Sequence, residues 1–234
     1  MRVLVVTAVA AERDAVCAAG GPYTPRALPG GLALHTAVAA SGPAVDVLAA
    51  GVGPAAAAAG TATALTAAAL KGAPYALVIS AGIGGGFAPA APLGSVVVAD
   101  ALTAADLGAE TPEGFLPVTE LGFGTVTHHP DPALVRAVAT ACGARIGPVL
   151  TVSTVTGSAA RAAELTARHP GALAEAMEGF GVAEAAVAHG AGVLEIRTVS
   201  NTVGPRDRAA WRIGPALTAL TGAFAALPAA LRAL

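Results

Sequence analysis

The sequence predicts an α/β fold, a single domain over residues 1–234 with three layers, α/β/α, around a central sheet. Apolar runs rich in valine and isoleucine recur along the chain without clean alternation of apolar and polar residues, and alanine-rich stretches separate them. Fully buried strands that alternate with helices are typical of a sheet covered on both faces. No linker or charge run divides the 234 residues, so one domain is the simplest organisation.

The apolar runs are expected to form the strands, and the stretches between and after them the helices. The expected strands cover residues 2–6, 45–53, 75–86, 94–100, 147–155 and 193–201. The expected helices cover Pro54–Leu70, Asp131–Ala141, Ser158–His169, Gly179–His189 and Ile213–Leu231. Pro54 suits a first helical turn, and Gly190 suits a helix stop. Residues 106–124 are acidic and punctuated by glycine and proline, which predicts a long loop, a common place for functional residues.

Charge and aromatic content exclude some classes of partner. The formal net charge is −2 at pH 7, the 13 lysine and arginine residues are scattered, and 3% of the residues are aromatic. A surface for nucleic acid or anionic membrane needs clustered positive charge, and a single-strand binder needs stacking aromatics. We therefore expect no nucleic acid and no membrane as partners, but a small molecule or another copy of the chain. Cys17 and Cys142 have no histidine at metal-ligand spacing and are expected to be buried thiols.

Two apolar segments look superficially like membrane or export segments. Residues 47–70 carry no charge, yet they contain glycine, proline and threonine and are otherwise mostly alanine, which is weakly apolar in a bilayer. Residues 1–14 match a signal peptide in outline, but their β-branched start is more typical of a buried strand that leads into a helix. These interpretations place both segments inside the fold and the protein in the cytoplasm.

A glycine-rich turn suggests an alternative function. Gly51–Ala56 fits the G-x-G-x-x-A pattern that joins a strand to a helix in dinucleotide-binding proteins. The acidic residue that holds the ribose about 20 positions later in that pattern is missing, since no acid occurs between Asp46 and Asp100. A second turn, Ser80–Phe87, has Phe87 where the third small residue would fall. Such glycines allow a ligand to approach the backbone, and tight turns alone explain them equally well.

Charged residues are few, so the position of each is informative. They make up 12% of the chain, about half the usual share. In the expected strand 193–201, Arg197 and Asn201 alternate onto the same face and can reach a common space. Glu178 stands just ahead of a helix, where the helix dipole favours an acid, and Glu12 also fits a first-turn acid. Taken alone, each acid has this structural explanation.

Together these stretches resemble the nucleoside phosphorylase superfamily, and within it the nucleosidases that hydrolyse a purine N-glycosidic bond. The resemblance runs in order through VVTAVAAE, AAGVGPAAAA, VISAGIGGGFAP, LGSVVVAD, EAMEGFGVAEAA and RTVSNTVG. Its specific part is the pair Met177 and Glu178, followed by a strand that ends in Arg-x-x-x-Asn. The resemblance implies the superfamily's α/β/α fold around a mixed sheet, a homodimer or higher homo-oligomer, and no cofactor.

The resemblance also implies roles for individual residues. Glu178 would accept hydrogen bonds from the ribose hydroxyls, while Met177 lies against the apolar face of the sugar. Glu12 would take a proton from the water that attacks the anomeric carbon as positive charge builds on the ribose. Arg197 would orient that carboxylate or the water.

Some positions depart from the nucleosidase pattern. Adenine-specific relatives carry aspartate where this chain has Asn201, whose amide can donate to a 6-oxo group and accept from a protonated N7, so the expected base is hypoxanthine or guanine. Ile83, beside Gly82 in the glycine turn, replaces a serine that relatives use near the nucleophile. Thr154 and Val155 stand where those enzymes often stack a phenylalanine on the purine.

The stretch SNTVGPRDRAAWRIGPAL resembles the futalosine hydrolases, which release hypoxanthine from futalosine in menaquinone biosynthesis. That substrate carries a carboxybenzoyl group at its 5′ end, so Arg206 or Arg208 is expected to bind the carboxylate, with Trp211 nearby. A solvated charged loop explains the two arginines as well. No lysine or arginine lies between Lys71 and Arg136, so the expected nucleophile is water and not phosphate, unless a neighbouring subunit supplies an arginine.

Other functions stay open at this point. A methylthioadenosine/S-adenosylhomocysteine-type nucleosidase and a purine nucleoside phosphorylase are the alternatives within the superfamily. A nicotinamide-dependent oxidoreductase would use Gly51–Ala56, and a binding module would hold a nucleoside without turnover. His128 and His129 are adjacent, so their side chains diverge, and no third ligand follows at a suitable spacing. We therefore expect no metal.

Overall fold

A mixed sheet of twelve strands forms the centre of the computed structural model, which describes residues 1–37 and 44–232. Its strands are β1 (Arg2–Thr7), β2 (Tyr23–Ala27), β3 (Ala33–Ala37), β4 (Ala44–Ala49), β5 (Leu77–Gly86), β6 (Val96–Val98), β7 (Leu102–Ala104), β10 (Thr127–His128), β11 (Arg145–Ile146), β12 (Val149–Thr151), β13 (Ala174–Ala176) and β14 (Gly192–Thr202). The order along the main path is β10-β7-β12-β13-β5-β1-β4-β3-β2, while β14 pairs with β5 and β6, and β6 pairs with β11. β5 is parallel to β1 and β14 but antiparallel to β13.

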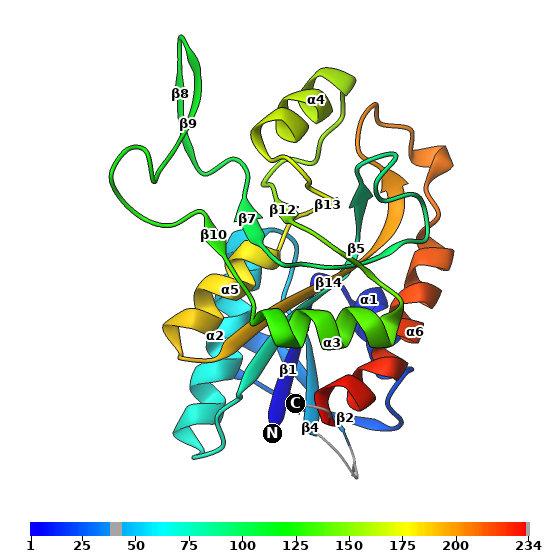
Figure 1. Ribbon diagram of the computed structural model, residues 1–234. Helices are drawn as coiled ribbons and strands as arrows, with labels where there is room; N and C mark the ends of the chain where they lie inside the picture. The colour runs from blue at the N-terminus through cyan, green and yellow to red at the C-terminus, as the bar shows by residue number, and fades with distance from the viewer. Residues whose placement is uncertain (38–43, 233–234) are drawn as a thin grey trace.

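Helices cover both faces of this sheet (Figure 1). The α-helices of the described residues are α1 (Ala10–Cys17), α2 (Pro54–Leu70), α3 (Pro132–Cys142), α4 (Ala159–Arg168), α5 (Gly179–Ala188) and α6 (Ile213–Arg232). α2 and α5 pack together on one face, whereas α1 and α3 pack with α6 on the other. Short 3₁₀ turns cover Pro29–Gly31 and Arg208–Ala210. The predicted three-layer α/β/α fold with a central mixed sheet is confirmed.

Each face of the sheet has its own apolar core. The core beneath α2 and α5 includes Leu48, Leu65 and Val182. The core beneath α1, α3 and α6 includes Leu220 and Phe224. Burial of one leucine or phenylalanine side chain contributes about 1.5–3 kcal/mol, so these two cores hold the helical layers onto the sheet.

The expected helices agree with the structure to within one residue at each end. Capping side chains at the helix starts explain why the sequence predicts these boundaries closely. Asp131 accepts hydrogen bonds from the backbone N–H groups of Ala133 and Leu134 where α3 begins. Ser158 accepts from the N–H of Arg161 where α4 begins. The expected strand-to-helix start of the chain is likewise present as β1 and α1.

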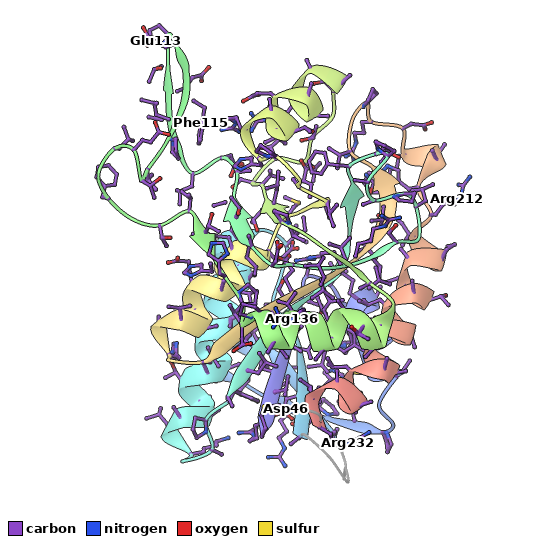
Figure 2. All side chains as sticks on the ribbon, in the orientation of Figure 1. Asp46, Glu113, Phe115, Arg136, Arg212 and Arg232 are labelled. Carbon is purple, nitrogen blue, oxygen red and sulfur yellow. The ribbon has the colours of Figure 1, made fainter. Side chains whose placement is uncertain are left out.

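Residues 106–124 form more than the long loop that the sequence predicts. They contain a hairpin of β8 (Gly108–Thr111) and β9 (Gly114–Pro117), which projects from the body with Glu113 at its tip (Figure 2). Phe115 on this hairpin packs against the Arg168 guanidinium, which lies 4.2 Å from the ring centroid. Gly114 has a φ of 130°, a conformation that favours glycine, so this glycine marks a turn between two strands.

α6 is long and apolar enough, by length and composition alone, to cross a membrane, with a mean hydropathy of 1.4. It is the one such helix in the part of the chain that the structure describes. Its side chains Leu220, Phe224 and Leu227 are buried in the core beneath it. Its apolar face is therefore accounted for by packing on the sheet. α2, which lies within the uncharged segment 47–70, packs against α5 as expected for a core helix.

Candidate active site

A cavity of about 430 Å³ opens at the carboxyl ends of the central parallel strands. Small-molecule sites span roughly 300–1,000 Å³, and ligands of α/β sheets bind at this edge. The cavity lies among the residues that follow β1, the glycine end of β5, the start of α5 and the end of β14. The predicted site residues that line it are Glu12, Ile83, Val155, Met177, Glu178, Asn201, Arg206 and Trp211.

Three backbone N–H groups hold the Glu12 carboxylate at the cavity. Oε2 accepts from the N–H of Ala8 at 3.0 Å and of Val9 at 3.3 Å, so the Glu12 side chain reaches back and satisfies backbone donors at the start of α1. Oε1 accepts from the N–H of Ile83 at 2.9 Å, so it also joins α1 to β5. Glu12 is therefore both the first-turn acid that its position suggested and a carboxylate in the cavity.

Burial is the largest influence on the Glu12 carboxyl and raises its pKa above the ordinary value of 4.5. The positive charge of Arg197 and the N–H of Ile83 favour the ionised form and act against this rise, while Glu178 adds to it. A carboxyl with a raised pKa exchanges its proton closer to neutral pH, as a general acid or base must.

The Glu178 carboxylate reaches a neighbouring turn and an arginine. Glu178 is the N-cap residue of α5, yet its side chain makes no capping hydrogen bond, so helix capping does not explain it. Oε1 accepts from the N–H of Gly53 at 3.2 Å, and Oε2 lies 3.2 Å from Nη1 of Arg197. The turn Gly51–Ala56 thus directs an N–H group at an acid, where a dinucleotide-binding turn would direct such groups at phosphate. Met177 lines the cavity beside this acid.

Arg197 lies behind the cavity wall with 1% of its surface exposed. Its Nε donates to Oε1 of Glu195 at 2.8 Å, and its Nη2 donates to Oγ of Ser80 at 2.9 Å. Its Nη1 makes the 3.2 Å ion pair with Oε2 of Glu178 and has no partner of hydrogen-bond geometry among the described residues. A Cβ at Gly82 would lie 2.5 Å from Oε1 of Glu12 and 2.8 Å from Nη1 of Arg197. Only glycine at this position leaves room for the two groups to meet.

A β-bulge shapes the end of β14. In its pairing with β5, Val199 lies opposite Gly84 and Asn201 opposite Gly85, so Ser200 is the extra residue. Strict alternation, which places Ser200 and Asn201 on opposite faces, is therefore wrong here, and both residues line the cavity. Oδ1 of Asn201 accepts from Oγ of Ser200 at 2.9 Å. One lone pair of Oδ1 and one proton of Nδ2 remain for a ligand.

Residues after β14 form another part of the cavity wall. The Arg206 guanidinium lies 5.3 Å from the centroid of the Trp211 ring, and both residues line the cavity. The N–H of Arg206 donates to the carbonyl of Gly157 at 3.2 Å. This bond joins the segment after β14 to the segment between β12 and α4, where Val155 and Thr156 line the cavity.

Four predicted residues are not in the cavity lining. Gly82 and Arg197 lie directly behind it, as the contacts above show. Thr154 is exposed, because the segment after β12 turns its neighbour Val155 towards the cavity instead. Arg208 is exposed in a 3₁₀ turn that the Asp207 carboxylate caps through the N–H of Ala209. Residues 106–124 contribute nothing to the lining, so the predicted functional loop is not placed at this cavity.

Sequence reasoning missed two buried acids at the site. Glu175 lines the cavity and accepts from both the N–H, at 2.8 Å, and the hydroxyl of Thr156. Glu195 is fully buried beside Arg197. The sequence indicated Glu195, because it lies two positions before Arg197 in an apolar strand and therefore on the same face of that strand. The indication for Glu175 is weaker: it is an acid two positions before Met177.

Comparison with known proteins identifies the family. The family described as the phosphorylase superfamily matches residues 2–227. A futalosine hydrolase of Streptomyces coelicolor is 68% identical over 228 residues, which cover 97% of this chain and 95% of that protein. A futalosine hydrolase of Acidothermus cellulolyticus is 48% identical over 232 residues, with 97% and 90% covered. The chain belongs to the phosphorylase superfamily and, within it, to the futalosine hydrolase family. The family predicted from the sequence is confirmed.

A solved structure supports the fold of this futalosine hydrolase family member. A 5′-methylthioadenosine/S-adenosylhomocysteine nucleosidase of Colwellia psychrerythraea, solved in complex with adenine, superimposes with a TM-score of 0.83. The match covers 99% of this chain and 96% of that chain, at 19% sequence identity. Identity this low shows the shared nucleoside phosphorylase-like fold alone.

Proposed function

We propose that this protein is an N-glycosyl hydrolase that cleaves futalosine into hypoxanthine and dehypoxanthine futalosine, a step of menaquinone biosynthesis. The observation that carries the proposal is the convergence of Glu12, Glu178 and Asn201 on one cavity. These three groups suit the three parts of the reaction: water, sugar and base. The relatives that are named futalosine hydrolases supply the substrate class.

Glu178 and Met177 would bind the ribose. Oε1 of Glu178 accepts one N–H, from Gly53 at 3.2 Å, and Oε2 accepts one N–H, from Met177 at 3.3 Å, so each oxygen keeps a lone pair for the sugar hydroxyls. Arg197 behind it pairs with Oε2 at 3.2 Å, so a positive charge faces the carboxylate from the side away from the cavity. The Met177 side chain offers an apolar, adaptable surface to the face of the sugar.

Glu12 would activate the water. Its two oxygens are fixed by backbone donors, so the carboxylate is already in place before substrate binds. As the glycosidic bond breaks, the ribose gains positive charge, and Glu12 both accepts the proton of the attacking water and stabilises that charge. Burial raises the pKa of Glu12, which makes its carboxylate a stronger base for this proton. Ile83, which stands where relatives have a serine, leaves its backbone N–H as the contact to Glu12.

Asn201 would select the purine. An amide can donate from Nδ2 to the 6-oxo group of hypoxanthine and accept at Oδ1 from the N–H of a protonated N7. The amide has no acidic proton to give, so N7 takes its proton from solvent as the glycosidic bond breaks, and the base leaves as a neutral molecule. A 6-amino group would face a donor with another donor, and an unpaired buried group costs about 1–3 kcal/mol. The site therefore favours a 6-oxopurine over adenine.

Arg206 and Trp211 would bind the 5′ carboxybenzoyl group. The guanidinium can pair with a carboxylate through two parallel hydrogen bonds, and the indole can lie against the ring. Both side chains are already close together, at 5.3 Å. Of the two arginines that the sequence offered for this role we retain Arg206, because Arg208 lies outside the cavity lining.

Water, and not phosphate, is the proposed nucleophile. Among the described residues that line the cavity, Arg206 is the one cation, and it lies after β14 and not at the glycine end of β5. Arg197, behind Gly82 of β5, is outside the lining and already faces three carboxyl groups, so its charge is not free for phosphate. A phosphorylase needs positive charge next to the anomeric carbon to hold phosphate.

We further propose that the protein acts in the cytoplasm and that it forms a homo-oligomer. Light scattering after gel filtration would test the oligomeric state.

The deciding experiment offers futalosine, 6-amino-deoxyfutalosine and methylthioadenosine in parallel, each with and without phosphate. The released base and sugar are identified by chromatography. We expect hypoxanthine from futalosine at a rate that does not depend on phosphate. Adenine as the preferred base, or a ribose 1-phosphate-type product, would refute the assignment.

A further inference from the structure

One buried charge is not used by the function proposed above. Glu195 on β14 is fully buried, and its Oε1 accepts from Nε of Arg197 at 2.8 Å. Its Oε2 has no hydrogen-bond partner among the described residues. Enclosing a carboxylate in this way is costly unless it does something that an apolar residue cannot. The residue therefore calls for a specific explanation.

The surroundings of Glu195 are shaped to hold it. A Cβ at Gly179, the first residue of α5, would collide with both oxygens of the Glu195 carboxylate. The amino end of a helix also carries partial positive charge, which favours an acid there. Glycine at position 179 thus lets the carboxylate sit between the start of α5 and Arg197.

Glu195 and Ser80 together fix the direction of the Arg197 guanidinium. They take Nε and Nη2, and the two residues lie opposite each other where β14 pairs with β5. The planar fork then has one orientation left. In that orientation Nη1 lies 3.2 Å from Oε2 of Glu178. It also lies next to Gly82, where the Glu12 carboxylate ends, because a Cβ at Gly82 would contact both groups.

We propose that Glu195 is a positioning residue of this site. It holds the Arg197 guanidinium through Nε, so that Nη1 stays directed at Glu178 and Glu12, and it offsets part of the positive charge of Arg197. The inference rests on the proposed function and deepens it. Glu195 itself touches neither the cavity nor the substrate, since it is absent from the lining.

The charge balance of this cluster gives the proposal a measurable consequence. The charged groups that face Arg197 are Glu195 from its own strand, Glu178 from the start of α5 and Glu12 from α1. β5 contributes the neutral Ser80, and the segment of β6 paired with β14 contributes only valines. One guanidinium therefore faces three carboxyl groups. Burial raises the pKa of Glu195, and the charge of Arg197 and its hydrogen bond to Oε1 oppose this rise. Burial raises the pKa of Glu12, and Arg197 opposes this rise.

The test is Glu195→Gln, which keeps the shape and the acceptor for Nε but removes the charge. The freed positive charge of Arg197 then favours ionised Glu12, so the pKa of Glu12 falls. We expect the acidic limb of the pH profile of kcat/KM for futalosine to move to lower pH by about one unit. Glu164→Gln is the matched control, because Glu164 pairs with Arg161 at 2.7 Å on α4, away from the cavity. Its profile should coincide with that of the wild type.

A second variant separates charge from geometry. Glu195→Asp keeps the charge but shortens the reach to Nε, so the acidic limb should stay in place while kcat/KM falls at least about tenfold. If Glu195 only caps α5 or fills space, Glu195→Gln will lower the midpoint of thermal unfolding and leave the acidic limb unmoved. That result, or a Glu195→Asp variant with wild-type kcat/KM, would overturn the proposal.

A titration of the ligand-free protein separates this inference from the proposed function. The Glu12 carboxyl is followed by ¹³C NMR and assigned by its absence in Glu12→Gln. Glu195→Gln should lower the pKa of that carboxyl relative to the wild type, whichever nucleoside is cleaved. An unchanged pKa would contradict the inference even if hypoxanthine is released, and a lowered pKa would support it even if futalosine is not the substrate.

Discussion

At the scale of single residues, the site works through the hydrogen-bonding capacity that its polar groups keep for a ligand. Asn201 is the informative case. Its Oδ1 lies 2.9 Å from Oγ of Ser200, whose one proton has Oδ1 and the Gly84 carbonyl, at 3.2 Å, as acceptors, and its Nδ2 donates to the carbonyl of Thr202 at 3.2 Å. These contacts favour one orientation of the amide. The remaining acceptor and donor then match a protonated N7 and a 6-oxo group.

The amide at position 201 is therefore expected to set the base preference. Asn201→Asp removes the donor to the 6-oxo group, so kcat/KM for hypoxanthine release from futalosine should fall about 100-fold. The ratio of rates for 6-amino-deoxyfutalosine and futalosine should rise. Parallel measurement of both bases by chromatography checks this, with the Glu164→Gln variant as control. An unchanged ratio would remove Asn201 from base selection.

Single residues were also where sequence reasoning was most informative. Glu12, Glu178 and Asn201 were assigned roles through the resemblance to the nucleosidases, whose specific part is the Met177-Glu178 pair and the strand that ends in Arg-x-x-x-Asn, while each acid taken alone had a structural explanation. Their partners could not be predicted, since the N–H of Ile83 and the N–H of Gly53 reach the two acids only through tertiary folding.

At the scale of elements, the chain connects the segments that line the cavity into one unit. Glu175 on β13 holds Thr156 through two hydrogen bonds, and Gly157 accepts from the N–H of Arg206. The segment between β12 and α4 and the segment after β14 are thereby joined. Burial raises the pKa of Glu175, and the two donors of Thr156 act against this rise.

Loss of one of these bonds should loosen the segment between β12 and α4. Thr156→Val removes the hydroxyl donor to Glu175 but keeps the shape and the N–H. We expect the KM for futalosine to rise several-fold, with a smaller change in kcat, because the segment must be ordered again on binding. Thr111→Val removes a comparable hydroxyl bond, to the Gly114 carbonyl in the hairpin, and should leave both constants unchanged. Equal effects of the two changes would refute this role of Thr156.

Elements differ in how far the sequence predicts them. α2 and α5 could be bounded closely, because proline and glycine mark their ends. The bulge at Ser200 breaks the alternation of β14, and nothing local in the sequence requires it. Short strands such as β7 and β13 were absorbed into neighbouring predictions or missed, since three residues carry no periodicity.

At the scale of the whole molecule, the cavity and a partly buried ion pair that stabilises the sheet lie at opposite ends of the sheet. The cavity lies at the carboxyl ends of β1 and β5. Asp46 is the third residue of β4 and lies near the opposite end of the molecule (Figure 2). The Asp46 carboxylate is buried and accepts from Arg2 at 2.6 Å and from the hydroxyl of Tyr75. These bonds fasten the starts of β1 and β4 and the approach to β5.

Asp46→Asn should therefore lower stability without altering the site. It removes the charge that pairs with Arg2, whose side chain is 32% exposed, and we expect the free energy of unfolding in urea to fall by about 2 kcal/mol. Asp14→Asn, at a surface pair with Arg13, is the control and should change it by less than about 0.5 kcal/mol. The kcat of the folded Asp46→Asn protein should match that of the wild type. A large loss of kcat without loss of stability would contradict this separation.

The central claim is that Glu12 performs the proton transfer of glycosidic hydrolysis in this cavity. The most direct measurement is the single-turnover rate of hypoxanthine release from futalosine by Glu12→Gln, together with the affinity for futalosine. We predict a loss of rate of at least about 1,000-fold, with the dissociation constant within a few-fold of the wild type. A variant that retains a tenth or more of the wild-type rate would contradict the account.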